Sequence, residues 1–135
     1  MKVVIDTNIL LTSIPNQSPN RWIYDAFISK KFIWVFSNEI LSEYAEMIGL
    51  QYSERAMQIV VSTLLTANNT QRFEPFYKWQ LIEQDADDNK FVDCSLGANV
   101  DYLVTDDRHF KILKTINFPK IAVVSASNFK SILKI

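Results

Sequence analysis

Hydrophobic and polar positions along the chain fall into blocks that predict short strands separated by helices. Apolar runs of four or five residues, largely β-branched or aromatic, are typical of strands that are buried on both faces of a sheet. Between these runs, apolar residues recur three and four positions apart, as on one face of an amphipathic helix. The predicted strands lie at residues 2–5, 32–36, 101–105 and 120–124. The predicted helices lie at residues 6–14, 20–31, 38–49, 53–67, 88–99, 106–114 and 125–134.

Local signals mark several helix ends. Ser37 and Ser53 each precede a helical segment and are predicted to cap it, because a serine hydroxyl accepts a hydrogen bond from a free backbone N–H group at a helix start. Gly49 is predicted to end the helix that Ser37 begins. Residues 69–87 have no clear period, and we expect loops and one short element there.

The alternation of strands and helices predicts the fold class. Strands that follow one another through helices form a parallel sheet with helices on both faces. We therefore expect an α/β fold, a three-layer sandwich with a central, mostly parallel sheet of four or five strands flanked by helices. A length of 135 residues suffices for one hydrophobic core, so residues 1–135 are expected to form a single domain.

The composition excludes several classes of function. Fourteen Lys and Arg against 15 Asp and Glu give a net charge of -1, which provides no overall basic field, so any nucleic-acid contact must be local. Two glycines are too few for a P-loop or a dinucleotide fingerprint, and one histidine rules out a His-rich zinc site. One cysteine cannot form an internal disulfide and fits a reducing cytoplasm. No apolar run approaches the roughly 18 residues of a membrane span.

Acidic side chains follow the predicted strands. Asp6 ends the first strand, and Asp106 and Asp107 come shortly after the third. Asp88 opens a helix, where the helix dipole favours a carboxylate, and Glu43 lies at the edge of an apolar helical stripe. Ligands of parallel sheets bind in the crevice at the carboxyl ends of the strands, so acids from four segments can meet there.

Such a group of acids predicts a metal-dependent reaction. Carboxylates in one crevice repel one another unless they share a cation. Mg²⁺ and Mn²⁺ prefer oxygen ligands and are held by carboxylates together with the phosphate oxygens of a substrate. An ion of this kind activates water and stabilises in-line displacement at phosphorus. The predicted reaction is phosphodiester hydrolysis.

In three blocks that occur in order, the chain resembles the PIN-domain nucleases: VVIDTNILL at residues 3–11, SNEILSEYAEMI at 37–48 and DADDNKFVDCSLGANVDYLVTDDRHF at 85–110. The resemblance is closest to the bacterial and archaeal toxin components of toxin-antitoxin pairs and is weakest over residues 50–80. It implies a cytoplasmic endoribonuclease that depends on Mg²⁺ or Mn²⁺. It also implies an RNA substrate, a cognate antitoxin protein as partner, and a homodimer.

The resemblance assigns roles to individual acids. Asp6 matches the acid that ends the first strand, Glu43 the helix acid, Asp88 the acid that opens the next helix and Asp107 the last acid. All four are expected to be catalytic and to bind the metal ion. Asp93 lies on the same helix as Asp88, five residues further on, and we expect it to be an additional metal ligand.

Polar residues beside these acids are expected to assist them. Thr7 and Asn8 match the polar pair that follows the first acid in the family, and together with Thr105 they are expected to position water or phosphate. The family often has Gly, Asn or Arg before its last acid, whereas this chain has Asp106 there. Either Asp106 or Asp107 could therefore face the crevice.

Basic residues near the expected site have two interpretations. Arg108, Lys111 and Lys114 could hold an RNA backbone, or they could form an ordinary solvated helix face, and the same choice applies to Lys90. His109 could contact RNA or donate a proton, but an exposed position at a helix start is favoured.

Two other functions compete with the nuclease. A catalytically silent PIN-like module that binds RNA or protein would be favoured if one of the four acids were replaced, and none is. An Asp-based phosphatase also begins with a strand that ends in Asp. It needs a second Asp two positions later, however, where this chain has Asn8.

Overall fold

The computed structural model describes all residues from 1 to 135 and contains one five-stranded sheet. Its order is β3-β2-β1-β4-β5, and every pair of neighbouring strands is parallel. The predicted α/β fold with a central parallel sheet is therefore confirmed. The strands are β1 (Lys2–Ile5), β2 (Ile33–Phe36), β3 (Thr70–Arg72), β4 (Tyr102–Val104) and β5 (Val123–Val124).

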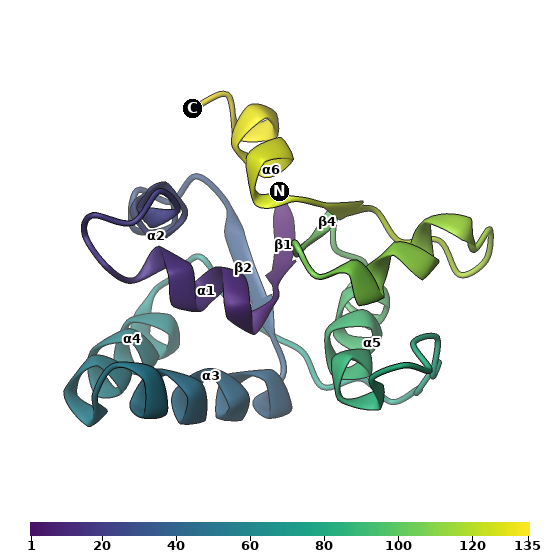
Figure 1. The fold of residues 1–135 in the computed structure, drawn as a ribbon, viewed down its shortest axis with the longest axis horizontal. Helices are drawn as coiled ribbons and strands as arrows, with labels where there is room; N and C mark the ends of the chain where they lie inside the picture. Colours follow the sequence, from purple (N-terminus) through teal and green to yellow (C-terminus); the bar gives the residue numbers. More distant parts are fainter.

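Helices cover both faces of this sheet. Figure 1 shows α5 on the opposite side of β1 and β2 from α1, α2, α3 and α4, and α5 packs against β1, β2 and β4. There are also two 3₁₀ helices: η1 precedes α5, and η2 follows β4. The helices are α1 (Thr7–Ser13), α2 (Arg21–Ile28), α3 (Asn38–Gln51), α4 (Glu54–Thr66), η1 (Ala86–Asp88), α5 (Asn89–Gly97), η2 (Arg108–Thr115) and α6 (Ala126–Leu133).

An aromatic cluster in the core fixes α3 against the end of β1. Trp34 is fully buried on β2, with its ring edge-on to Phe27 at 5.1 Å and to Tyr44 at 6.1 Å. Its Nε1 donates a hydrogen bond of 3.3 Å to the Tyr44 hydroxyl, which donates in turn to the Ile5 carbonyl oxygen. Buried polar groups without partners are destabilising, so this chain of bonds specifies where α3 lies. It places the residue before Tyr44, Glu43, close to the end of β1.

The predicted serine caps are confirmed, whereas the predicted end of α3 is wrong. Ser37 Oγ accepts from the Ile40 N–H at 3.2 Å, and Ser53 Oγ accepts from the Ala56 N–H at 3.0 Å. α3 continues through Gly49, because no glycine in the chain adopts the left-handed conformation that would end a helix.

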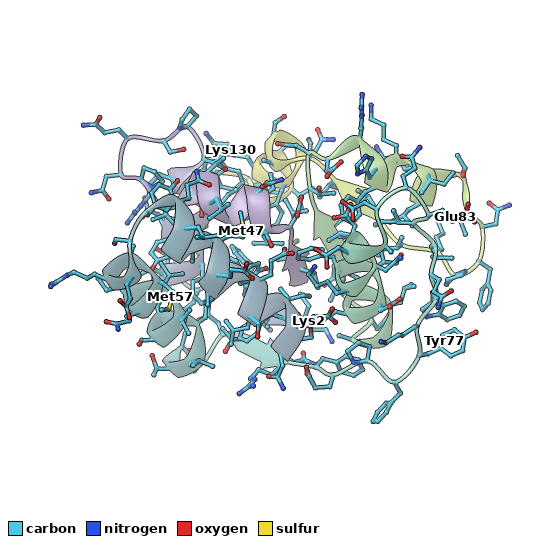
Figure 2. The ribbon with its side chains drawn as sticks, turned by 60° about the horizontal axis from the view of Figure 1, so that its bottom comes forward. Lys2, Met47, Met57, Tyr77, Glu83 and Lys130 are labelled. Carbon is cyan, nitrogen blue, oxygen red and sulfur yellow. The ribbon has the colours of Figure 1, made fainter.

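The segment without clear periodicity contains the expected short element, the edge strand β3. After β3, residues 73–85 run beside α5 without regular structure, and Figure 2 shows Tyr77 and Glu83 at the outer margin of the molecule. Two side chains of α5 hold this segment. Asp93 Oδ1 accepts from the Trp79 N–H at 3.0 Å, and the Asn89 side chain bonds both the N–H and the carbonyl of Ile82 at 2.9 Å.

None of the helices combines the length and the apolar character that crossing a membrane would require.

Candidate active site

The site lies where two central strands end side by side. β1 pairs with β2 on one side and with β4 on the other, so the connections from β1 and from β4 leave in opposite directions, which opens a crevice. In the register, Ile5 is opposite Val104, and the Asp6 N–H donates to the Val104 carbonyl at 3.0 Å. Thr105 Oγ1 then donates to Asp6 Oδ2 at 2.8 Å and accepts from the Asp107 N–H at 3.0 Å. Thr105 therefore joins the two acids.

Asp6 is buried among other carboxylates. Its side chain makes no capping bond to α1, although Asp6 is the residue that precedes that helix. Burial raises the pKa of Asp6 to about 6, against the hydrogen bond from Thr105, and the negative charges of Asp88, Asp107 and Glu43 raise it further. The structure therefore brings together the four acids that the sequence singled out, from four separate segments.

Asp88 is less buried than Asp6, and it too lies beside Asp107. It precedes α5, but its carboxylate accepts no capping hydrogen bond from that helix and is available to the crevice. Burial raises its pKa to about 6, with contributions from the charges of Asp85 and Asp107, while His109 opposes the shift. Asp88 Oδ2 and His109 Nδ1 are both buried without a hydrogen-bond partner, and they lie 3.4 Å apart.

The two candidates for the last acid point to different partners. Asp106 Oδ1 accepts from the Ala126 N–H at 3.1 Å, at the start of α6. Asp107 Oδ1 accepts from the His109 N–H at 2.9 Å and lies 3.5 Å from His109 Nδ1. Only Asp107 contributes to the raised pKa values of both Asp6 and Asp88, so the geometry favours Asp107 as the inward acid. Both acids border a small pocket together with Asp6 and Asn8.

Glu43 is paired with the buried Lys90, a contact that the sequence did not indicate. Lys90 Nζ lies 2.8 Å from Glu43 Oε1 and 2.9 Å from Asp87 Oδ2, and the Lys90 side chain is only 4% exposed. Both interpretations of Lys90, an RNA contact or a solvated face, are therefore wrong. Burial alone would lower the pKa of Lys90, but the hydrogen bonds to Glu43 and Asp87 outweigh it and raise that pKa. Thr7 Oγ1 donates to the second oxygen of Glu43.

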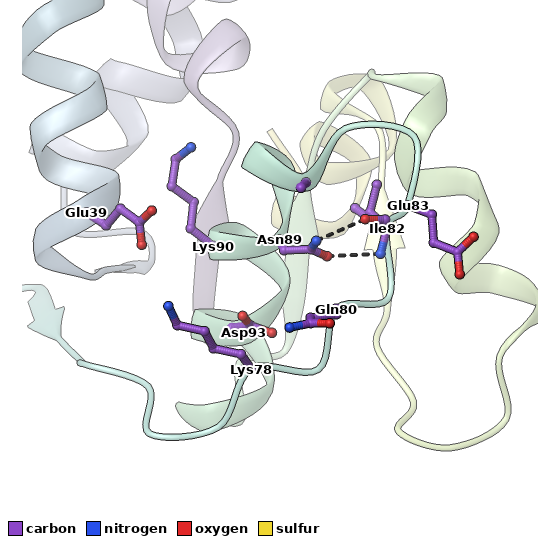
Figure 3. A pocket seen from close by; sticks show the side chains of 9 residues that line it. Glu39, Lys78, Gln80, Ile82, Glu83, Asn89, Lys90 and Asp93 are labelled. Atoms are coloured by element: carbon purple, nitrogen blue, oxygen red, sulfur yellow. Dashed lines mark hydrogen bonds between the residues drawn. The ribbon is translucent and has the colours of Figure 1, made fainter.

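Asp93 is not part of this group of acids. Its carboxylate accepts the Trp79 N–H, and its pKa is raised mainly by burial, with Lys78 and Glu39 as its charged neighbours. Figure 3 shows Lys90 and Asp93 leaving α5 in different directions, with Asp93 beside Lys78. Five residues along a helix turn a side chain away from its starting direction, which is why Asp93 and Asp88 do not converge. We therefore leave Asp93 out of the proposed metal site.

A family model described as the PIN domain matches residues 2–109. This chain belongs to the PIN-domain family. No curated protein matches the chain. Three solved structures share the fold of this PIN domain at low sequence identity.

VapBC2 from Rickettsia felis, bound to a DNA fragment from their promoter, gives a TM-score of 0.63 at 19% identity and covers 93% of this chain and 98% of its own. VapC20 from Mycobacterium tuberculosis, a Sarcin-Ricin loop cleaving toxin, gives a TM-score of 0.59 at 13% identity. The match covers 81% of this chain and 92% of VapC20. FitAcB from Neisseria gonorrhoeae gives a TM-score of 0.57 at 14% identity, and the match covers 93% of this chain and 98% of the FitAcB chain. At these identities the likeness concerns the fold.

The acids of this PIN domain fit a divalent cation. Asp88 Oδ2 is buried without a hydrogen-bond partner, and Asp6 receives a side-chain hydrogen bond only from Thr105. Burial raises the pKa values of both carboxyl groups, and neighbouring negative charges raise them further. Carboxylate oxygens are the ligands that Mg²⁺ and Mn²⁺ prefer. Asp85, Asp88 and His109 offer ligand atoms within 4.8 Å of one another. Asp6, Asp88 and Asp107, whose charges act on one another, could hold such an ion.

A basic pocket adjoins the acids of the PIN domain. It has a volume of about 560 Å³, and Arg108, His109 and Lys111 line it, whereas Lys114 does not. The favoured interpretation of His109 as an exposed residue is wrong, because its side chain is 30% exposed and faces two of the acids. The available signal was its position two residues after Asp107, at the same strand end.

Proposed function

We propose that this PIN domain is a metal-dependent endoribonuclease that hydrolyses RNA phosphodiester bonds. The observation that carries the proposal is that burial and the like charges of three carboxylates raise the pKa values of Asp6 and Asp88 to about 6. Asp6 follows β1, Asp88 precedes α5 and Asp107 follows β4. Carboxylates that repel one another at a functional site can be stabilised by a shared cation. We treat residues 1–135 as one nuclease domain.

Each acid in this proposal has a defined support. Thr105 fixes the orientation of Asp6 through its hydroxyl, and it fixes the backbone of Asp107 through the same oxygen. Asp88 immediately precedes the first residue of α5. When bound, Mg²⁺ or Mn²⁺ would polarise the phosphodiester and lower the pKa of water, so that hydrolysis proceeds at neutral pH. Asp6, Asp88 and Asp107 would hold that ion.

RNA would approach along the basic pocket. Arg108 and Lys111 line it, and both belong to η2, which begins directly after Asp107. Cationic side chains beside a carboxylate group can bind the phosphates that flank a scissile bond. Asn8 borders the small pocket next to Asp6, where it could contact phosphate or water.

We also propose that the protein is the toxin of a toxin-antitoxin pair. The sequence resemblance to that group and the structural similarity to VapC20, a Sarcin-Ricin loop cleaving toxin, support this role. A cognate antitoxin would then be the protein partner, and a cytoplasmic location follows from the same proposal. A homodimer remains a prediction, and the exposed Leu50, Ile59 and Leu65 of α3 and α4 are candidates for its interface.

The first test is cleavage of a labelled, mostly single-stranded RNA by the purified protein with Mg²⁺, with Mn²⁺ and with a chelator. Asp6→Asn should abolish cleavage while the circular-dichroism spectrum stays unchanged, because the substitution removes a repelling charge. Asp25→Asn is the matched control, since Asp25 is exposed on α2 and pairs with Arg21. Cleavage that is equal in wild type and Asp6→Asn, or that persists in chelator, would contradict the proposal.

A further inference from the structure

The ammonium group of Lys90 has every donor in use. It contacts Glu43 Oε1 at 2.8 Å, Asp87 Oδ2 at 2.9 Å and the Asp87 carbonyl oxygen at 2.8 Å. A lysine ammonium carries three N–H donors, so these three acceptors account for all of them. Because the side chain is also 4% exposed, Lys90 is a fixed charge rather than a mobile surface lysine.

Glu43 is consequently paired within the protein, with a lysine that it shares with Asp87. One of its oxygens binds Lys90, and the other accepts the hydroxyl of Thr7. A divalent cation placed on Glu43 would lie next to the Lys90 ammonium, and two positive charges in that position repel each other. Glu43 therefore already has Lys90 as its cationic partner, and the charge of Lys90 disfavours a metal ion on Glu43.

The opposite holds for the neighbouring aspartates. Asp88 Oδ2 is buried without a hydrogen-bond partner, and Asp6 has only the hydroxyl of Thr105 as a side-chain donor. No lysine or arginine forms an ion pair with Asp6, Asp88 or Asp107. His109 Nδ1 is the basic nitrogen beside them, 3.4 Å from Asp88 Oδ2 and 3.5 Å from Asp107 Oδ1. Three carboxylates without a lysine or arginine partner therefore lie in this part of the crevice.

We propose that Lys90 is a positioning residue that occupies the place of a cation at Glu43, so that the protein binds one divalent ion, on Asp6, Asp88 and Asp107. Glu43 is then not a metal ligand. It is held by Lys90 and Thr7 at the edge of the site. This inference rests on the proposed function, since it concerns the ion that the nuclease would use.

The test measures Mn²⁺ binding by titration calorimetry and by electron paramagnetic resonance, at constant pH and ionic strength and without RNA. Wild type should bind one Mn²⁺ per chain. Asp88→Asn should weaken that binding by more than about tenfold, as expected when a ligand is lost, whereas Glu43→Gln should change it by less than about threefold. Glu43→Gln that weakens Mn²⁺ binding as much as Asp88→Asn does would overturn the inference.

Lys90 itself is tested by stoichiometry, which a purely structural role would not change. Lys90→Met frees Glu43 and Asp87 and should raise the number of bound Mn²⁺ ions from one to two, whereas Lys90→Arg keeps the charge and should keep one. The double variant Lys90→Met with Glu43→Gln removes both charges of the pair, which guards against misfolding of Lys90→Met alone, and it should again bind one Mn²⁺. Two ions in wild type, or one ion in folded Lys90→Met, would overturn the inference.

These outcomes separate the inference from the proposed function. One Mn²⁺ whose binding depends on Glu43, together with metal-dependent RNA cleavage, would overturn the role of Lys90 and leave the nuclease intact. Wild-type protein that binds no Mn²⁺ and cuts no RNA would overturn both.

Discussion

Asp87 and Asp88 are neighbours in the sequence, yet the pKa values of their carboxyl groups shift in opposite directions. The hydrogen bond from Lys90 lowers the pKa of Asp87, whereas burial and like charges raise the pKa of Asp88 to about 6. Asp87 belongs to what we call the lysine side of the site, with Lys90 and Glu43. Asp88 belongs to the aspartate side, with Asp6 and Asp107.

A group of acids is therefore not a uniform metal site. The lysine side has one protein cation for two carboxylates. The aspartate side has three carboxylates and no lysine or arginine partner, with only the imidazole of His109 beside Asp88 and Asp107, so a cation from solution would complete it. Variants on the two sides should therefore differ in their effects.

The largest expected effect is on RNA cleavage. Asp107→Asn should lower kcat/KM by at least about 100-fold, because it removes a ligand from the aspartate side. Asp87→Asn should lower it by less than about tenfold, because the Glu43–Lys90 pair remains. Both are measured with a labelled RNA at saturating Mn²⁺. Equal losses in the two variants would mean that the two sides do not differ in function.

Divalent cations should stabilise the folded protein through the aspartate side. At a Mn²⁺ concentration about 100 times Kd, the free energy of unfolding should rise by about 2.7 kcal/mol, since the ion binds only the native state. Thermal unfolding with and without Mn²⁺ measures the change. The increase should largely disappear in Asp6→Asn and persist in Asp25→Asn. A Tm that does not respond to Mn²⁺ in wild type would contradict the assignment.

Without divalent cations, stability should fall as the pH rises. Asp6 and Asp88 have pKa values of about 6 in the folded state against 3.8 for the ordinary group, so between pH 4 and 6 the folded state binds more protons than the unfolded state. Stability from these groups is therefore present at low pH and lost through that window, by about 1 kcal/mol for each after solvent screening. The lowered pKa of Asp87 acts in the opposite direction.

Urea unfolding in chelator from pH 4 to 7 checks this prediction. Asp6→Asn should flatten the profile and, at pH 7, raise the free energy of unfolding slightly above that of wild type. A wild-type profile in which stability rises steadily over the same range would show that the aspartate side is balanced after all.

The smallest expected effect is on RNA binding by the lysines in the two pockets next to the aspartate side and the lysine side. Lys111 lines the pocket next to the aspartate side, and Lys78 lines the pocket that also contains Lys90 and Asp93. Lys111→Ala should raise KM by about threefold and weaken its dependence on salt, because a phosphate contact is lost. Lys78→Ala removes the same charge and should change KM less. The reverse order would place the RNA over the lysine side.

Much of this arrangement could be predicted from the sequence, because it depends on local signals and on strand order. Asp6 and Thr105 each follow an apolar run, and adjacent parallel strands bring such positions together. Ser37 and Ser53 act within three residues of their own positions. The residues next to Asp6, Thr105, Ser37 and Ser53 in the sequence therefore indicate where these four side chains lie.

The remaining features depend on contacts between distant segments. β3 has the sequence Thr-Gln-Arg, which shows no apolar pattern, and it is a strand only because it pairs with β2. Lys90 looks like any helical lysine until α3 brings Glu43 to it. Asp93 had the right chemistry for a metal ligand, but the loop that contains Trp79 takes up its carboxylate. In each case the partner lies too far along the chain for periodicity to indicate it.

The bond between Thr105 and Asp6 joins positions that are 99 residues apart, and this separation affects how the protein is made. A ribosome that has translated residues 1–100 has already produced Asp6, Glu43 and Asp88, but neither Thr105 nor Asp107. Domains generally fold as units, so the sheet is not complete until β4, which pairs with β1, has been made. The nascent chain therefore passes most of its synthesis without a complete set of carboxylates, and a prematurely terminated chain would lack them permanently.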